Sequence, residues 1–216
     1  MKIVCVGYRS WALSIYKELK KNKKLKILII DNKKKLKIKK ILNFDPKFIL
    51  FYGWSWKVSN SLIDRYKCIM LHPSKLPQYK GGSPIQNQII EGKKKSAITL
   101  FRMNKHFDAG NIILQKSFSL EGSIETIFNQ ITNVGIELTN KMLKGKYKEK
   151  KQPNKKYKIY KRRKPKDSEI TLKELKEKKS EFLFNKIRML GGPYPNAFIR
   201  TKDGKKLFIK KVRIGK

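Results

Sequence analysis

Two loops of this sequence carry side chains that can accept and hold a proton. His72 follows the apolar run 68–71 and opens a loop with three prolines and the pair Gly81-Gly82, and Asp108 lies in the polar loop 104–111. An imidazole changes its protonation state near neutral pH, and a neighbouring carboxylate stabilises the protonated ring. Taken singly, a histidine at a turn is often a surface residue, and an aspartate beside glycine is often a turn residue. Their joint occurrence favours a site for general acid–base chemistry.

The residues around these loops resemble the folate-dependent formyltransferases. The resemblance is carried by His72-Pro-Ser-Lys-Leu-Pro-Gln-Tyr-Lys-Gly-Gly-Ser-Pro-Ile-Gln86 and Asp108-Ala-Gly110, and it extends to 51–56, 162–167 and 192–198. That family includes methionyl-tRNA, glycinamide-ribonucleotide and nucleotide-sugar N-formyltransferases. The stretches 53–56 and 81–87 look closest to the enzymes of bacterial surface-sugar and flagellar-sugar pathways. The resemblance therefore implies an enzyme that moves a formyl group from 10-formyltetrahydrofolate to the primary amine of an amino-sugar nucleotide, in lipopolysaccharide or flagellar glycan biosynthesis.

The resemblance also assigns roles, with one departure from the family pattern. The family site is a trio of Asn, His and Asp, with the Asn two residues before the His; that position is Met70 here, and its side chain cannot donate a hydrogen bond. The pattern implies that His72 is the general base for the amine and that Asp108 orients and stabilises it. A donor for the developing oxyanion is then missing, which can cost about 3 kcal/mol. A backbone N–H of residues 81–83, the side chain of Asn87 or a water is expected to replace it.

Further residues of the same loops are expected to bind the two substrates. The resemblance places the folate at Tyr52, Gly53, Trp54, His106, Phe107 and Asp108, through backbone contacts and ring packing. The acceptor is expected at Arg9, Ser10, Ser74, Lys75, Tyr79, Lys80, Gly81, Gly82 and Asn87. Each set has a structural alternative. The two close tryptophans can be core packing, Arg9 and Ser10 can be an exposed turn and a helix N-cap, and loop lysines can simply be solvated.

The elements that must position these loops form an α/β pattern. We expect strands at 2–7, 26–30, 48–52, 68–71, 97–103 and 111–118, and helices over 11–19, 59–66, 85–90 and 123–143, with Ser83 and Ser123 as N-caps. A charged connector with weak helical character is expected at 33–40. The pattern predicts a Rossmann-like, open, mostly parallel sheet, with His72 and Asp108 at neighbouring strand ends. The first turn lacks G-x-G-x-x-G, so a dinucleotide site is not predicted.

Composition changes after residue 146, where lysine and proline become frequent. We expect a catalytic domain at 1–146, a lysine-rich linker at 147–170 and a small C-terminal subdomain at 171–216. That subdomain should contain one helix from about Thr171 to Met189 and a hairpin that pairs 196–201 with 206–212. A full C-terminal barrel like that of the methionyl-tRNA enzyme would need several more strands. This expectation favours the amino-sugar acceptor.

The formal net charge of +38 is the usual mark of a nucleic-acid partner. Lysine, however, greatly exceeds arginine and is scattered through the whole chain, while Asn and Ile are also abundant. An A+T-rich coding genome explains this mixture better than a dedicated RNA surface does. Initiator-tRNA formylation remains the enzymatic alternative, and a non-catalytic folate- or nucleotide-binding relative, motivated by Met70, is the other.

The apolar runs and the two cysteines indicate where the protein is expected to work. No apolar run reaches the ~20 residues that a membrane span needs, so no membrane partner is expected. Cys5 and Cys68 lie in apolar runs without metal-ligand spacing. We therefore predict buried free thiols, no metal and a cytoplasmic location. The sequence does not decide between a monomer and a homodimer.

Overall fold

The computed structural model describes residues 1–215, and its centre is a six-stranded sheet. The strands are β1 (Lys2–Val6), β2 (Lys26–Ile30), β3 (Phe48–Tyr52), β4 (Lys67–His72), β6 (Lys95–Arg102) and β7 (Ile112–Ser119), in the order β2-β1-β3-β4-β6-β7. The first four strands are parallel, and β6 runs antiparallel to both of its neighbours. The predicted Rossmann-like, mostly parallel sheet is confirmed. None of the helices within residues 1–215 combines the length and apolar character that crossing a membrane requires.

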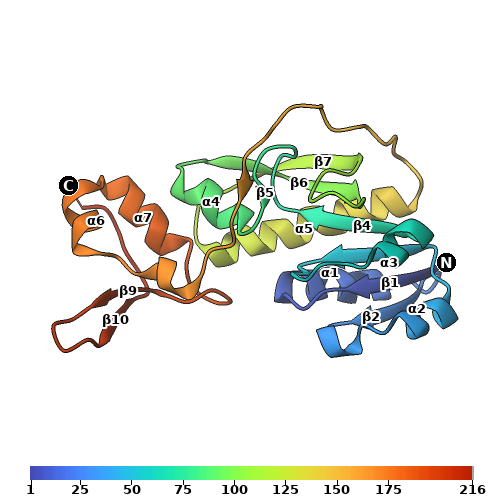
Figure 1. Cartoon of the computed structure of the whole chain (residues 1–216), viewed down its shortest axis with the longest axis horizontal. Coiled ribbons are helices and arrows are strands. Elements are labelled where there is room, and N and C mark those ends of the chain that lie inside the picture. The colour runs from blue at the N-terminus through green and yellow to red at the C-terminus, as the bar shows by residue number, and fades with distance from the viewer. Residues whose placement is uncertain (216) are drawn as a thin grey trace.

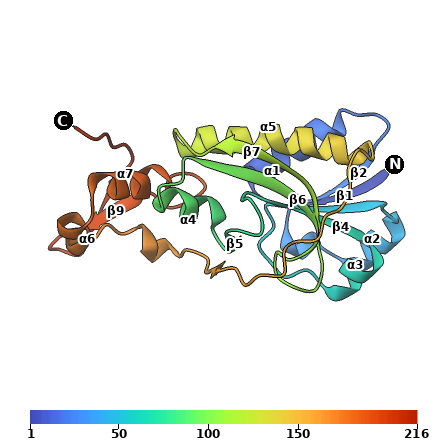
Figure 2. The same cartoon turned by 90° about the horizontal axis from the view of Figure 1, so that it is seen from above.

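Helices cover both faces of the sheet (Figures 1 and 2). On one face lie α1 (Ser10–Lys20) and α5 (Ile124–Leu143), and on the other α2 (Ile38–Phe44), which follows a short 3-10 turn at Lys33–Lys35, and α3 (Asn60–Arg65). Alternate residues of β3 serve the two cores: Leu50 packs with α1 and α5, whereas Ile49 packs with α2 and α3. Because both faces of the central strands are buried, these strands are continuous apolar runs.

Serine hydroxyls cap only one of the two helices at which a cap was predicted. Ser123 Oγ accepts a hydrogen bond from Thr126 N–H, as a side-chain N-cap of α5 should. At α4 (Pro84–Ile90), Ser83 holds the predicted N-cap position and Pro84 lies in the first turn, but Ser83 has φ 49 and its hydroxyl accepts from Arg163 N–H instead of capping the helix. At α1 the N-cap position is Arg9, and Ser10 is the first, exposed residue of the helix.

The lysine-rich segment after α5 is held against the body of the protein. It crosses the side of the sheet away from α5 (Figure 2) and forms β8 (Ile159–Tyr160), which pairs in parallel with β5 (Lys80–Gly81) of the His72 loop. A 3-10 turn at Pro165–Ser168 then leads into the C-terminal unit. We call residues 147–170 the strap.

The C-terminal unit contains α6 (Leu172–Glu177), α7 (Ser180–Arg188) and the hairpin of β9 (Ala197–Arg200) with β10 (Lys206–Ile209). The hairpin is as predicted, but the single helix over 171–189 was wrong, because Lys178 and Lys179 are extended and divide it. The change of direction lets α7 bury Ile187 in the same apolar core that α1 and α5 share. The unit thus packs against the body through α4 and the start of α5 (Figure 1).

Candidate active site

His72 is the last residue of β4, and its ring is buried with only 5% of the residue exposed. Its Nε2 lies 2.9 Å from the carbonyl oxygen of Tyr79. A carbonyl oxygen can only accept, so Nε2 carries the hydrogen and the neutral ring has its lone pair on Nδ1. Nδ1 in turn lies 3.7 Å from Oδ2 of Asp108. The ring therefore has one nitrogen held by the backbone and one nitrogen free to take a proton beside a carboxylate.

Asp108 reaches His72 from an unexpected direction. The two residues were predicted at neighbouring strand ends, but β6 is antiparallel to β4 and its last residue, Arg102, lies opposite Ile69. The loop after β6 therefore starts near the beginning of β4 and must fold back toward His72. Two features allow this return: Asp108 has φ 47, which aspartate tolerates better than most residues, and Gly110 packs so closely on Arg102 that a Cβ would lie 1.6 Å from its carbonyl oxygen.

Two contacts then hold Asp108 in place. Its Oδ2 accepts a hydrogen bond from Gly81 N–H at 2.8 Å, which ties the Asp108 loop to the His72 loop. From the strap, Gln152 Nε2 donates to the carbonyl oxygens of Asp108 at 3.0 Å and Gly110 at 2.8 Å. Sequence reasoning missed Gln152, because a glutamine in a lysine-rich segment carries no signal of what it contacts. The predicted pair is thus held together by one predicted residue, Gly81, and by one that was not predicted, Gln152.

The His72 loop uses several of its predicted acceptor residues for its own structure. Ser74 is fully buried, and its hydroxyl donates to Gln78 O at 2.7 Å while its carbonyl accepts from Thr99 Oγ1. Asn87 is buried and donates from Nδ2 to Gly82 O at 2.9 Å. Lys75 is exposed, and Lys80 is half-buried in β5.

The structure removes two of the groups that were expected to replace the missing hydrogen-bond donor for the oxyanion. Gly81 N–H is donated to Asp108 and Gly82 N–H to Tyr160 O, so neither is free for a substrate oxygen. Met70 lies on the same face of β4 as His72, since side chains two residues apart share a face, and it packs with Met103 against the apolar core on the side of α3. Of the groups predicted from the sequence, Ser83 N–H, the second amide hydrogen of Asn87 and a water remain.

An aromatic cluster follows β1 and β3 at the edge where His72 lies. Trp54 and Trp56 pack edge to face with ring centroids 4.7 Å apart, and the Tyr8 ring is 4.9 Å from that of Trp56. Gly53, with φ +60, sits against Arg9, whose guanidinium lies over the Tyr8 ring at 5.0 Å. The indole N–H of Trp54 is buried without a hydrogen-bond partner in residues 1–215.

The other predicted folate residues divide into buried and exposed ones. Tyr52 is fully buried, and its hydroxyl pairs with Thr139, so this residue can offer a ligand only its backbone. His106 and Phe107 are exposed residues of the loop 104–111, just before Asp108, and Phe107 is 68% exposed. That large apolar side chain next to a buried carboxylate is a surface to which a flat ring can bind.

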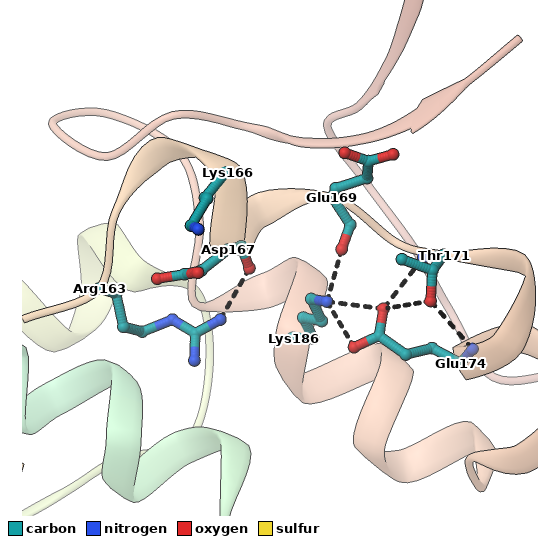
Figure 3. Close-up of a pocket in the computed structure, with 7 residues that line it drawn as sticks. All are labelled: Arg163, Lys166, Asp167, Glu169, Thr171, Glu174 and Lys186. Atoms are coloured by element: carbon teal, nitrogen blue, oxygen red, sulfur yellow. Dashed lines mark hydrogen bonds and ion pairs between the residues drawn. The ribbon is translucent and has the colours of Figure 1, made fainter. Parts of the chain in front are cut away.

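A polar hollow of about 410 Å³ lies elsewhere, between the strap and the C-terminal unit (Figure 3). One ion pair and two bonds to main-chain oxygens hold its side chains: Lys186 Nζ donates to both carboxylate oxygens of Glu174, at 2.6 and 2.7 Å, and to the main-chain oxygen of Glu169, while Arg163 donates to the main-chain oxygen of Asp167. Burial acts to raise the pKa of Glu174, but hydrogen bonds from Lys186 and Thr171 bring it below its usual value. None of the predicted site residues lines this hollow, and we interpret it as a structural junction.

Comparison with known proteins identifies the family. Residues 31–143 match the family described as Formyl transferase. The methionyl-tRNA formyltransferase of Rickettsia massiliae is 35% identical over 104 residues, which cover 47% of this chain and 34% of that protein. The chain thus spans about a third of the length of such curated relatives.

Solved structures extend the similarity to the whole fold. A methionyl-tRNA formyltransferase from Clostridium thermocellum superposes with a TM-score of 0.85 and 30% identity, covering 97% of both chains. A 4-N formyltransferase from Francisella tularensis has a TM-score of 0.73 and 20% identity, covering 100% of this chain and 98% of that one, and shares the fold. On the strength of the family match and the Clostridium structure, this chain belongs to the formyl transferase family.

Proposed function

We propose that this protein transfers a formyl group from 10-formyltetrahydrofolate to a primary amine. The observation that carries the proposal is the buried pair of His72 and Asp108, with Nδ1 3.7 Å from the carboxylate and Nε2 already held by a backbone carbonyl. Formyl transferases use 10-formyltetrahydrofolate as donor, which supplies an activated one-carbon acyl group. The chain itself must then bind the amine, remove its proton and return a proton to the leaving nitrogen.

His72 can perform both proton transfers at one atom. In the neutral ring Nδ1 has the lone pair, so it takes the proton that the amine loses as the new N–C bond forms. The ring then has a hydrogen on each nitrogen: the hydrogen on Nε2 stays with Tyr79 O, and that on Nδ1 faces Asp108. The negative charge of Asp108 stabilises this cation until the proton is returned from Nδ1 to the leaving nitrogen. Asp108 itself keeps its bond to Gly81 throughout.

The residues predicted to hold the folate fit a flat conjugated ring. The unpartnered N–H of Trp54 needs an acceptor, and a ring nitrogen or carbonyl of the donor would supply one after a small shift of the loop. Phe107, the residue before Asp108, is 68% exposed and offers an apolar surface. Trp54 lies in the loop after β3, and Met103 lies just before the Asp108 loop. Both pack in the same apolar core, which supports a donor site between the loop after β3 and the Asp108 loop.

Two classes of molecule are candidates for the amine that accepts the formyl group. The residues of 53–56 and 81–87 favour an amino-sugar nucleotide, as expected from the sequence. The identities of 35% and 30% to methionyl-tRNA formyltransferases favour methionyl-tRNA, and the exposed lysines of the strap beside the site would suit its phosphates. Methionyl-tRNA is therefore the first acceptor to test, with amino-sugar nucleotides as the second.

A formyl-transfer assay with both acceptor classes tests the proposal. We expect tetrahydrofolate release with one class and at least a ~100-fold lower rate for His72→Asn, the low end of general acid–base contributions. Glu177→Gln is the control, because its carboxylate is 57% exposed on α6 and pairs only with Lys173 in the part of the chain that the structure describes. Folate binding without transfer to any amine would instead support the non-catalytic alternative.

A further inference from the structure

The tautomer of His72 depends on the placement of one carbonyl group. Tyr79 O accepts from Nε2 at 2.9 Å, and Tyr79 has φ 55, a left-handed conformation that a tyrosine rarely adopts. A backbone in this region persists only when its surroundings hold it there. The contacts of Tyr79 therefore bear directly on which nitrogen of His72 carries the hydrogen.

Tyr79 is held by one carboxylate and one residue of the strap. Its hydroxyl donates to Oε2 of Glu91 at 2.7 Å, and the hydroxyl of Tyr160 donates to Oε1 of the same side chain at 3.0 Å. The two phenol rings stack with centroids 5.0 Å apart at an interplanar angle of 20°. A main-chain hydrogen bond also joins the strap to the His72 loop, because Gly82 N–H donates to Tyr160 O at 2.7 Å.

Glu91 has neutral hydrogen-bond partners in a chain rich in cations. The sequence has 54 Lys and Arg residues, yet in the part that the structure describes Glu91 makes no ion pair, and its carboxylate accepts from the two phenols. Burial and the proximity of Glu91 raise the pKa of both Tyr79 and Tyr160. Both phenols therefore stay protonated, as donors, across the neutral range.

We propose that Glu91 and Tyr160 are positioning residues that hold the Tyr79 carbonyl on Nε2 of His72 and so leave Nδ1 as the basic atom. The inference rests on the proposed function in taking His72 as the base. Without the clamp, Tyr79 would relax from φ 55 and its carbonyl would leave Nε2. The ring could then place its hydrogen on Nδ1 and donate it to Asp108. In that tautomer, Nδ1 cannot accept the proton of the amine.

Imidazole ¹⁵N spectroscopy tests the clamp directly. The chain has two histidines, so a His106→Gln background leaves the signal of His72 alone. We expect the Nε2–H tautomer in the wild-type protein and a mixture of tautomers in Glu91→Ala and Tyr160→Ala. Glu91→Gln keeps an acceptor oxygen and should restore most of the wild-type spectrum. Tyr157→Ala is the matched control: Tyr157 lies on the same strap and makes no hydrogen bond through its hydroxyl within residues 1–215.

Kinetics provide a second readout that simple loss of stability would not give. We expect the turnover number of Glu91→Ala and Tyr160→Ala to fall by about tenfold, part of the ~100-fold that a placed base supplies, with KM for the folate unchanged. Tyr160→Phe keeps the stacked ring and provides a folded variant if the alanine change unfolds the strap. A wild-type Nδ1–H tautomer, or folded variants with a wild-type spectrum, would overturn the inference. Absence of formyl transfer with the expected tautomers would instead count against the proposed function alone.

Discussion

Asp108→Asn separates the charge of this residue from its shape. The amide oxygen can still accept from Gly81 N–H, a bond of 2.8 Å in the structure, so the loop should keep its place. What disappears is the negative charge 3.7 Å from Nδ1 of His72. The substitution therefore asks how much the carboxylate contributes to stabilising the ring once it has taken the proton of the amine.

The size of the effect follows from the distance. Two unit charges 3.7 Å apart attract by about 4.5 kcal/mol at an effective dielectric constant of about 20, and by about 1 kcal/mol in bulk water. Both side chains are 6% exposed, so the first value is the closer one. Each ~1.4 kcal/mol changes a rate tenfold, and we therefore expect formyl transfer to slow by at least ~100-fold.

Single-turnover formyl transfer under saturating donor and acceptor is the appropriate assay, since it isolates the chemical step from product release. Calorimetric titration should show unchanged affinity for tetrahydrofolate. Asp64→Asn is the control, because its carboxylate is 56% exposed and pairs with Lys105. A correctly folded Asp108→Asn protein that loses less than about threefold, roughly 0.6 kcal/mol, would refute the assignment of Asp108 as the group that stabilises protonated His72.

Three further predictions concern other parts of the site and core. Gly53→Ala should weaken tetrahydrofolate binding by about tenfold, because the new Cβ would lie 2.8 Å from that of Arg9 at φ +60, a strain of roughly 1–2 kcal/mol; an unchanged affinity by titration would remove this loop from the site. Burial raises the pKa of Cys68 to about 12 and that of Cys5 further, so a thiol reagent at pH 8 should react only after denaturant unfolds the protein; rapid labelling of the native protein would contradict this. Met70→Asn should leave turnover unchanged or lower, and a gain near the ~100-fold that one oxyanion donor supplies would favour the non-catalytic interpretation.

The parts of the fold that could be predicted are those where one residue pattern has one physical solution. The run 48–52 is apolar at every position because both of its faces are buried, and it is β3 as expected. The helix over 123–143 combines a serine cap with apolar residues at helical spacing, and both signals were right. Cys5 and Cys68, predicted as buried free thiols from their apolar surroundings, are buried and free.

The misses share a different cause. The direction of β6 cannot be derived from its own residues, because a buried strand has the same composition whichever way it runs, and so the route of Asp108 to His72 was predicted incorrectly. The break at Lys178 leaves no trace in the sequence, since charged residues suit both an exposed helix and an extended link. Gln152 acts through backbone carbonyls, which every residue has. The direction of β6 and the role of Gln152 both depend on contacts with residues far away in the sequence, and those contacts are made through main-chain groups that every residue has.

The strap shows how a segment with few apolar residues can still define an active site. Gln152 bonds the Asp108 loop, Tyr160 bonds the His72 loop, and Arg162 donates to Ser55 Oγ in the aromatic cluster at 2.6 Å. Most of these contacts satisfy polar groups of the three loops, so the strap is held without burying much apolar surface. Its lysines are consequently free to remain exposed. Replacing these lysines should change how anionic acceptors bind and leave proton transfer at His72 intact. The strap residues that support the His72–Asp108 pair are Gln152 and Tyr160, not the lysines.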